Sequence, residues 1–366
     1  MKIKKSTWFW LLSGIVAVGL RLIASPEMIE RLYSRGIFIG IRNVIDYTIG
    51  WLPIPLIYIF VIGLVAILVI RIRRFFKLDM KWQRRLGSAL LGILTFISGG
   101  IFLFLILWGY NYGRLPLEQQ LNLKPQPLTI EELRTELETT ATELIQLRAA
   151  IPAVTDSALT SDYFPADLEH QLRASLTNWL QQNGYPTPGR VRGRTLFPKG
   201  IFLRFSSSGL YFPFTGEGNV DAGLLHLQRP FVMAHELSHG YGFGDEGLCN
   251  FLGYMACMNA ADPVIQYCGK LGYYRYVASD YLRYHPEAYQ EFRAQLPLGI
   301  PNDLNAINTN LNDYPDIMPR LRYAAYDTYL KTQGITEGMK NYNRIVMLKR
   351  AYEESNASFK NSNTIK

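Results

Sequence analysis

Three long apolar segments constrain the fold of this chain more than any other feature of its sequence. Residues 51–70 carry no charge over 20 positions, and residues 86–113 carry none over 28. Residues 6–20 form a third uncharged run, which Arg21 separates from Leu22–Ala24. A helix needs about 20 apolar residues to cross the hydrocarbon core of a bilayer, and the long stem of an arginine lets its charge reach the headgroups. The sequence therefore predicts three transmembrane helices, at about residues 7–24, 51–70 and 88–110.

The positive charge of the chain is concentrated in this apolar part. The formal net charge is +8, of which residues 1–113 contribute +10 and the remainder −2. This distribution gives no indication of a nucleic-acid partner. Seven Lys or Arg residues lie within residues 71–85, and short loops rich in these residues stay in the cytoplasm. We therefore expect the N-terminus and this loop inside the cell, and everything after residue 113 outside.

Two alternatives leave this topology unchanged. The first apolar segment could be a cleaved signal peptide, although Arg21 and the lack of a small-x-small cleavage site argue against cleavage. A cleaved chain would still place its C-terminal part outside. The basic loop could also bind anionic lipid while it remains in the cytoplasm.

The rest of the chain is expected to form one domain after a linker. Residues 114–128 hold three prolines that break any helix. Thr129 followed by Glu132 is a capping box, which indicates the start of a helix. We predict a domain over residues 129–355 and a polar tail over residues 356–366.

Hydrophobic periodicity in this domain favours helices around a small sheet. A loop is expected at residues 186–193, and strands at about residues 201–205, 210–214 and 220–225. This extended region could hold a substrate as an added strand, or it could simply cover the core. Helices are expected at about residues 129–149, 165–182, 230–240, 245–260, 263–296, 301–332 and 335–355.

A metal-binding motif lies in the middle of this domain. Residues 235–239 read His-Glu-Leu-Ser-His, which is the H-E-x-x-H pattern. Positions four residues apart share one face of a helix, so the imidazoles of His235 and His239 can bind one metal ion. The carboxylate of Glu236 would lie beside them and could take a proton from zinc-bound water. The motif is typical of zinc peptidases and predicts Zn²⁺ as the cofactor.

A catalytic zinc takes three protein ligands, and two neighbouring carboxylates could supply the third. Asp245 fits H-E-x-x-H-x-x-G-x-x-D spacing, with Gly242 at a sharp turn. Glu246 fits a plan in which a second helix supplies a glutamate. Asn250 follows on the same helical face, where it could orient a ligand imidazole. We favour Glu246 as the ligand and interpret Asp245 as a helix cap.

Other polar residues near the motif form less specific patterns. The spacing of the three cysteines matches no zinc finger, so we interpret Cys249 and Cys257 as core residues and leave a disulfide to Cys268 open. His226 is more typical of a strand residue than of a fourth ligand. A donor to the oxyanion of an acyl transfer is expected among the tyrosines and arginines that follow: Tyr273, Tyr274, Arg275, Tyr276, Tyr281 and Arg283.

Taken over nearly all of residues 30–355, the chain resembles a bacterial family of three-helix membrane proteins with an H-E-x-x-H site, described only as a domain of unknown function. The segments that carry the resemblance are residues 108–116, 211–219, 234–239, 242–243, 246, 250–252 and 329–331. Members of that family look like membrane-tethered zinc peptidases of the gluzincin type. The resemblance implies Glu246 as the third ligand and a bacterial inner membrane as the location.

The sequence therefore predicts a mainly helical α+β chain, with three transmembrane helices followed by a zincin-like domain that contains a small sheet. The expected function is a membrane-anchored zinc metallopeptidase that hydrolyses peptide bonds with a zinc-bound water activated by Glu236. The alternative is a non-catalytic zinc-binding sensor or signal-transducing membrane protein. The expected partners are the lipid bilayer and a peptide or protein substrate near the membrane.

Overall fold

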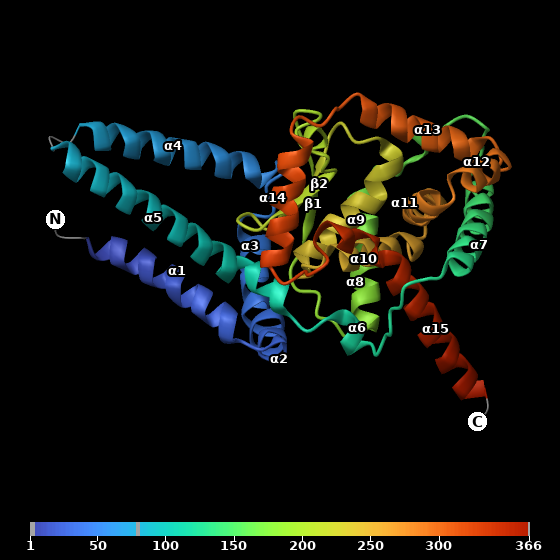
Figure 1. The fold of residues 1–366 in the computed structure, drawn as a ribbon, viewed down its shortest axis with the longest axis horizontal. Coiled ribbons are helices and arrows are strands. Elements are labelled where there is room, and N and C mark those ends of the chain that lie inside the picture. The colour runs from blue at the N-terminus through green and yellow to red at the C-terminus, as the bar shows by residue number, and fades with distance from the viewer. Residues whose placement is uncertain (1–3, 78–80, 365–366) are drawn as a thin grey trace. The chain divides into compact units, whose positions relative to one another are not determined.

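A computed structural model of the chain describes residues 4–77 and 81–364, with side chains described as far as residue 357. Parts of three sequence predictions lie outside these residues: the first residues of the N-terminus that is expected inside the cell, the middle of the basic loop, and the last two residues of the polar tail. The chain divides into two compact units (Figure 1). Unit 1 comprises Met1–Leu115, Pro188–Arg190 and Phe212–Glu217, and unit 2 comprises Pro116–Thr187, Val191–Tyr211 and Gly218–Lys366.

Among its described residues, unit 1 contains three helices that are long and apolar enough to cross a membrane: α1 (Lys5–Ile23), α4 (Leu56–Phe76) and α5 (Trp82–Leu107). Many of their large apolar side chains are exposed, as expected for helices that contact lipid. The second helix begins at Leu56 rather than at Trp51, because Pro53 and Pro55 lack an amide N–H and disfavour helical backbone before them. The three helices indicate association with a membrane.

The segment between α1 and α4 is also largely helical. It contains α2 (Pro26–Met28), the π-helix η1 (Ile29–Ile37) and α3 (Phe38–Thr48). Glu30 is buried, and its carboxylate forms ion pairs with Arg35 at 2.7 Å and with Arg114 at 2.8 Å. Arg114 follows the short helix η2 (Gly109–Gly113), so the pair joins η1 to the end of the α5 region. A buried carboxylate needs such partners because burial without them destabilises the fold.

Unit 2 begins with a short helix that the sequence does not predict, α6 (Leu117–Gln120), which lies within the segment expected to be a non-helical linker. The next helix, α7 (Ile130–Ala149), starts where the sequence predicts and begins with a complete capping box. The hydroxyl of Thr129 accepts the N–H of Glu132, and the Glu132 carboxylate accepts the N–H of Thr129 at 2.7 Å. The predicted capping box is therefore confirmed.

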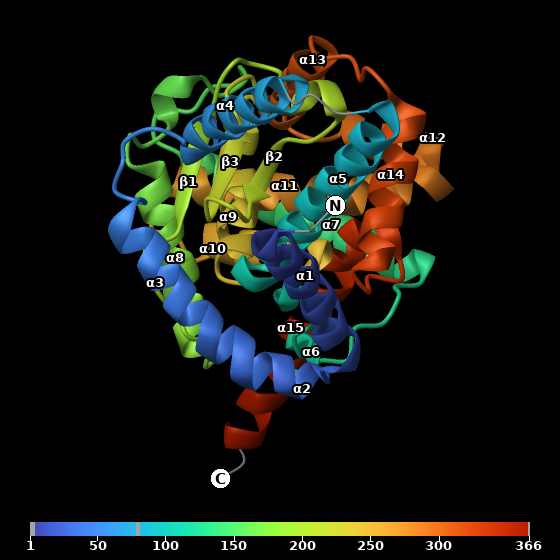
Figure 2. The same cartoon turned by 90° about the vertical axis from the view of Figure 1, so that its left-hand side faces the viewer.

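Within residues 4–77 and 81–364, three strands form a small sheet in the order β1-β3-β2: β1 (Arg192–Leu196), β2 (Gly209–Phe212) and β3 (Glu217–Asp221). Figure 2 shows β3 between the other two strands. In the part of the chain that the structure describes, β2 is therefore an edge strand, and one side of its backbone makes no bonds within the sheet. The predicted mainly helical fold with a small sheet is confirmed.

The strand boundaries differ from those predicted. The segment at residues 201–205 is a turn with a 3-10 helix at Leu203–Phe205, not a strand. The buried carboxylate of Asp221 explains this difference, since it accepts three backbone N–H groups from residues 200–203, at 2.7 to 3.2 Å. The first strand instead starts within the predicted loop at residues 186–193. Side-chain bonds between distant residues, which local pattern does not reveal, set these boundaries.

Helices make up most of the remainder of unit 2: α8 (Leu168–Gln182), α9 (Arg229–Gly240), α10 (Glu246–Met258), α11 (Pro263–Tyr284), α12 (Pro286–Ala294), α13 (Gly299–Asn312), α14 (Pro319–Thr332) and α15 (Arg344–Thr364). Short 3-10 helices lie between them: η3 (Ser161–Tyr163), η5 (His226–Gln228) and η6 (Gly338–Asn343). The predicted helices at 263–296 and 301–332 are each two helices. Pro286 and Pro315 lie at the breaks, because a proline disfavours helical backbone in the residue before it.

Helices α9 and α10 lie in the core of unit 2 and contact each other closely. A Cβ added at Gly253 of α10 would lie 3.1 Å from the backbone nitrogen of His235 on α9. Glycine therefore lets the two helices approach until their backbones nearly touch. Apolar side chains that are fully buried, such as Leu237, Phe251 and Leu252, surround this contact. The core thus fixes the position of the helix that carries the H-E-x-x-H motif.

Candidate metal centre

Helix α9 presents both histidines of the motif on one face. Pro230 lies in its first turn, where the missing N–H removes no helical hydrogen bond. The ring centroids of His235 and His239 are 4.8 Å apart, and their Nε2 atoms are 3.0 Å apart. The four-residue spacing therefore directs both Nε2 atoms to one point.

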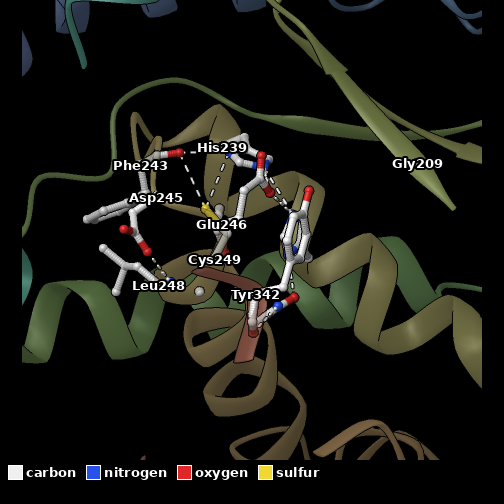
Figure 3. A network of polar contacts seen from close by, with 12 residues as sticks. Gly209, His239, Phe243, Asp245, Glu246, Leu248, Cys249 and Tyr342 are labelled. Atoms are coloured by element: carbon white, nitrogen blue, oxygen red, sulfur yellow. Dashed lines mark hydrogen bonds and ion pairs between the residues drawn. The ribbon is translucent and has the colours of Figure 1, made fainter. Parts of the chain in front are cut away.

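Glu246, the first residue of α10, faces the two imidazoles. Its Oε2 lies 3.1 Å from His235 Nε2 and 3.4 Å from His239 Nε2. One possible ligand atom from each residue lies within 4.8 Å of the others, and all three residues are buried. Figure 3 shows Glu246 beside His239. Two imidazole nitrogens and a carboxylate oxygen that converge in this way could hold a metal ion.

The other nitrogen of each imidazole is held by a fixed acceptor. His235 Nδ1 lies 2.8 Å from Asn250 Oδ1, and the Asn250 amide in turn donates to the carbonyl of Tyr342 at 3.0 Å. His239 Nδ1 lies 2.8 Å from the carbonyl of Phe243. These contacts place a proton on each Nδ1 and leave each Nε2 for a metal, which is the usual arrangement around metal-binding histidines. Asn250 thus lies where the sequence analysis expects it.

Asp245 has a different role from its neighbour. Its carboxylate accepts the N–H of Leu248 at 2.7 Å, so it caps α10 (Figure 3). The same carboxylate pairs with Arg344 at 2.7 Å and accepts from Asn341 at 2.9 Å. Within the described residues, the group that could hold a metal contains Glu246 and not Asp245. These contacts engage the Asp245 carboxylate elsewhere, as expected for a helix cap.

The three cysteines are free thiols buried in the core. Cys249 Sγ lies 3.4 Å from His239 Nδ1 and 3.3 Å from the carbonyl of Phe243. Burial raises the pKa of the Cys249 thiol to about 11, even though His239 lowers it, so the sulfur is uncharged at neutral pH. Cys249 therefore packs on the Nδ1 side of the imidazole, away from the converging Nε2 atoms. Cys257 and Cys268 form no disulfide in this structure.

The side chain of Glu236 on α9 packs against residues of the strands β2 and β3. Its carboxylate accepts a backbone hydrogen bond from Tyr211, and its Oε2 has no hydrogen-bond partner among the described residues. A Cβ added at Gly209 would lie 2.6 Å from Glu236 Oε1, and one added at Gly218 would lie 2.7 Å from Glu236 Cβ. Burial raises the pKa of the Glu236 carboxyl above its ordinary value, although both motif histidines oppose this. The site thus contains a buried carboxyl group with an unused oxygen.

Two tyrosines that the sequence analysis did not identify complete the surroundings. The hydroxyl of Tyr326 on α14 donates to Glu246 Oε1 at 3.1 Å, and the hydroxyl of Tyr342 donates to that of Tyr326 at 3.2 Å. The Tyr342 ring lies parallel to that of His235, with centroids 6.5 Å apart. Neither tyrosine stands at a motif spacing, since they follow Glu246 by 80 and 96 residues. The sequence offers no local signal that identifies them.

The predicted oxyanion donors are distributed differently. Tyr273 donates to Glu136 at 2.8 Å, as part of a polar cluster on other helices. Tyr276 does lie near the centre, because its hydroxyl bonds to Asn250. His226 is in a 3-10 helix rather than a strand, and its Nε2 lies 2.5 Å from a backbone carbonyl. Within the described residues it is not part of the group that could hold a metal.

The charges of the centre shift the pKa values of its members in opposite directions. Burial disfavours the protonated form of His239, but the neighbouring Glu246 carboxylate favours it, and the pKa of His239 is raised. Burial also disfavours the ionised form of Glu246, but the two imidazoles lower its pKa below the usual range. Without a metal, a protonated imidazole therefore neutralises the negative charge of the Glu246 carboxylate. A bound metal cation would neutralise that charge instead.

The chain matches one described protein family over most of its length. The model of the family described as "Protein of unknown function (DUF3810)" matches residues 33–349. No curated protein and no solved structure matches the chain. The matched residues include the apolar helices α4 and α5, the H-E-x-x-H motif and Glu246. Because the match covers far more than half of its residues, this chain belongs to the DUF3810 family of proteins of unknown function.

Proposed function

We propose that this protein is a membrane-anchored, zinc-dependent metallopeptidase in which Glu236 is the catalytic residue. The observation that carries the proposal is the convergence of His235 Nε2, His239 Nε2 and Glu246 Oε2, which lie 3.0 to 3.4 Å from one another. A buried glutamate with an unused oxygen stands next to His235 on the same helix. Two imidazoles and one carboxylate are a donor set of catalytic zinc in peptidases, and the residues present fit that ion.

The number of ligands supports a catalytic site rather than a structural one. Structural zinc is usually closed by four protein ligands, whereas catalytic zinc keeps one position open. In the part of the chain that the structure describes, the group contains three possible ligands. The thiol of Cys249 is close, but it contacts the Nδ1 side of His239. This arrangement favours the peptidase over a non-catalytic sensor.

The residues around the centre are suited to move a proton and to stabilise charge. When bound, zinc would supply Lewis acidity toward a peptide carbonyl and toward water. Glu236 has a raised pKa and a free Oε2, so it can take a proton from the attacking water and pass it to the leaving amine. The Tyr326 hydroxyl, now bonded to Glu246, can donate to the oxyanion that develops on the substrate.

The sheet gives a place for an extended substrate. Tyr211 lies in the edge strand β2, and its backbone bonds to Glu236. A peptide that adds to this edge would lie beside the residue that moves the proton. Peptide or protein substrates are therefore the class that we propose.

The charge pattern supports a location for the reaction. The apolar helices indicate a membrane, and exposed Lys and Arg residues at the C-terminal end of α4 and the N-terminal end of α5 would face the cytoplasm. Unit 2 would then act outside the cytoplasm of a bacterial cell, on substrates near the membrane surface.

The full chain, purified in detergent and loaded with zinc, tests the proposal. Cleavage of a quenched fluorescent peptide library should be lost in Glu236→Gln, with kcat lower by about 10²–10⁴-fold and zinc content unchanged. Glu138→Gln removes an exposed carboxylate on α7 and is the matched control, which should cleave like the wild type.

Three outcomes would contradict the proposal. Equal cleavage by the wild type and Glu236→Gln would remove Glu236 from the mechanism. One bound zinc without cleavage of any peptide would favour the sensor. A fourth protein ligand, seen by X-ray absorption at the zinc edge, would indicate a structural site.

A further inference from the structure

The β2–β3 hairpin is shared between the two units of the chain. Its turn, Phe212–Glu217, belongs to unit 1, whereas the strand residues on either side belong to unit 2. The turn is bonded to helices of unit 1, and the strand residues contact Glu236. The backbone is continuous through both parts, so the position of the turn and the position of the strands depend on each other.

Arg42 holds one side of the turn. This residue of α3 is 1 % exposed, and its Nη1 donates to the carbonyl of Gly216 at 2.7 Å. Its guanidinium also pairs with Asp46, one helical turn later. The φ of Gly216 is +71°, and a Cβ there would lie 2.6 Å from Arg42 Nη1. The guanidinium therefore occupies the space that a side chain at position 216 would need.

Asp46 extends the same attachment to the segment that precedes β1. Its Oδ2 accepts the N–H of Arg190 at 2.7 Å, and residues 188–190 also belong to unit 1. A Cβ at Gly189 would lie 2.2 Å from this oxygen, so the backbone and the carboxylate are in direct contact. The Arg42–Asp46 pair thus bonds both to the β2–β3 turn and to the segment that precedes β1.

Glu217 holds the other side of the turn. Its carboxylate is buried and accepts the N–H of Leu56, the first residue of α4, at 2.7 Å. That N–H has no partner within its own helix, and a negative charge there is stabilised by the helix dipole. One turn later, the ring of Phe60 stacks on Phe214 with centroids 5.3 Å apart. A polar bond and an aromatic contact therefore fix the turn to α4.

The strand residues in unit 2 meet Glu236 directly next to these attachments. Gly218 follows Glu217, and its α-carbon leaves no room for a side chain against Glu236. Tyr211 precedes Phe212, and its backbone bonds to the Glu236 carboxylate. A displaced turn would therefore move both contacts, and a misplacement of about 1 Å in an active site can lower the rate by about 100-fold.

We propose that Arg42 and Glu217 are positioning residues for Glu236, acting through the β2–β3 hairpin whose turn they hold and whose strand residues contact that carboxylate. The inference rests on the proposed peptidase function. It adds that the reaction depends on helices of the membrane-associated unit, so that removing them would impair the chemistry as well as the location of the enzyme.

The test uses the full chain in detergent or nanodiscs, with zinc bound. Arg42→Lys keeps a positive charge beside Asp46 but removes the guanidinium N–H that donates to the carbonyl of Gly216. Glu217→Gln removes the negative charge at the start of α4. Each variant should keep its zinc, lose about 10- to 100-fold in kcat and change KM little. Amide hydrogen exchange in residues 209–221 should become faster. Arg35→Gln, which breaks a pair with Glu30 in the same unit without touching the hairpin, is the control and should change neither property.

Hydrogen exchange separates this inference from the proposed function. Unchanged exchange at residues 209–221 in both variants would overturn the positioning role, whether or not the enzyme is active. If the wild type cleaves no peptide, the peptidase proposal fails, and faster exchange in the zinc-loaded variants still supports the attachment of the hairpin. If kcat stays at the wild-type level while exchange rises, Glu236 does not depend on the turn and the inference is wrong.

Discussion

At the scale of single residues, Asn250 links a metal ligand to the fold around it. Its Oδ1 faces His235 Nδ1, and its amide donates to the Tyr342 carbonyl. The second bond determines which end of the amide faces the imidazole, because only the nitrogen can donate to a carbonyl. Asn250 therefore sets the tautomer of His235 with Nε2 free, which is the form that binds a metal.

Replacing this asparagine should weaken metal binding without removing a ligand. Asn250→Ala is expected to lower zinc affinity by about 10- to 100-fold, because the imidazole loses the acceptor that orients it. Competition with a chromophoric chelator measures the change. Asn259→Ala, at an exposed position after the same helix, is the control. Equal affinities of the two variants would show that Asn250 does not support the site.

The coupled charges of the centre predict how metal affinity depends on pH. The raised pKa of His239 stabilises the metal-free fold below about pH 6.5, and this contribution is lost as pH rises through the folded value. The lowered pKa of Glu246 stabilises the fold above about pH 4.5, and this contribution is lost as pH falls. The ion pair between His239 and Glu246 therefore stabilises the metal-free fold most in mild acid, where protons compete with a metal ion for the imidazole.

Zinc should displace one proton when it binds. Affinity is expected to fall by about tenfold for each pH unit of acidification below the folded pKa of His239, because a metal ligand must be deprotonated. Calorimetry in two buffers with different ionisation enthalpies counts the released protons. No released proton and no dependence on pH between 6 and 8 would contradict the assigned charges.

At the scale of secondary-structure elements, close backbone contact determines where the H-E-x-x-H helix lies. Gly253 lets α10 approach α9, and Gly209 and Gly218 let two strands approach Glu236. None of the three has a positive φ, so space rather than backbone conformation requires glycine there. Small residues at the contacts thus bring helix, strand and carboxylate together.

Adding a single methyl group at this contact should lower the stability of the fold. Gly218→Ala would place Cβ 2.7 Å from Glu236 Cβ and 3.1 Å from its backbone, so we expect a loss of about 1–3 kcal/mol in unfolding free energy. Thermal unfolding of the full chain measures this loss, and kcat should fall in parallel. Gly40→Ala, at a position with no atom within 4 Å of the new Cβ, should leave both unchanged. A melting temperature equal to that of the wild type would show that the hairpin relaxes freely.

At the scale of the molecule, ion pairs with a buried lysine join helices that are distant in sequence. Lys349 on α15 pairs with Glu136 on α7 at 2.8 Å, across 213 residues. The lysine side chain is 5 % exposed, and the same carboxylate accepts the hydroxyl of Tyr273 from α11. One partly buried carboxylate thus connects three helices of unit 2.

Two glutamates on one helix allow a direct comparison. Glu136→Gln should lower the unfolding free energy by about 3 kcal/mol, because it leaves Lys349 buried with Glu353 as its remaining partner. Glu138→Gln, which breaks an exposed pair with Arg134, should change it by about 1 kcal/mol or less. Denaturant unfolding of both variants measures the difference. Equal effects would show that the pair with the buried Lys349 contributes no more than the exposed pair.

Local features of the fold could be predicted because they depend on neighbouring residues. The spacing of His235 and His239 follows from helical geometry alone, and the capping box at Thr129 from two residues three positions apart. Strand boundaries could not be predicted in this way. The carboxylate of Asp221 binds backbone groups about 20 residues away and changes the predicted strand at 201–205 into a turn.

The sequence by itself determined which segments are apolar enough for a bilayer and which helix face carries the two histidines. Both properties follow from composition and from a period of 3.6 residues. The tertiary structure alone decided that Tyr326 and Tyr342 reach the metal centre and that the hairpin beside Glu236 is attached to α3 and α4. Those contacts join residues from 16 to more than 160 positions apart, and their formation depends on the packing of whole helices, which no local pattern in the sequence encodes.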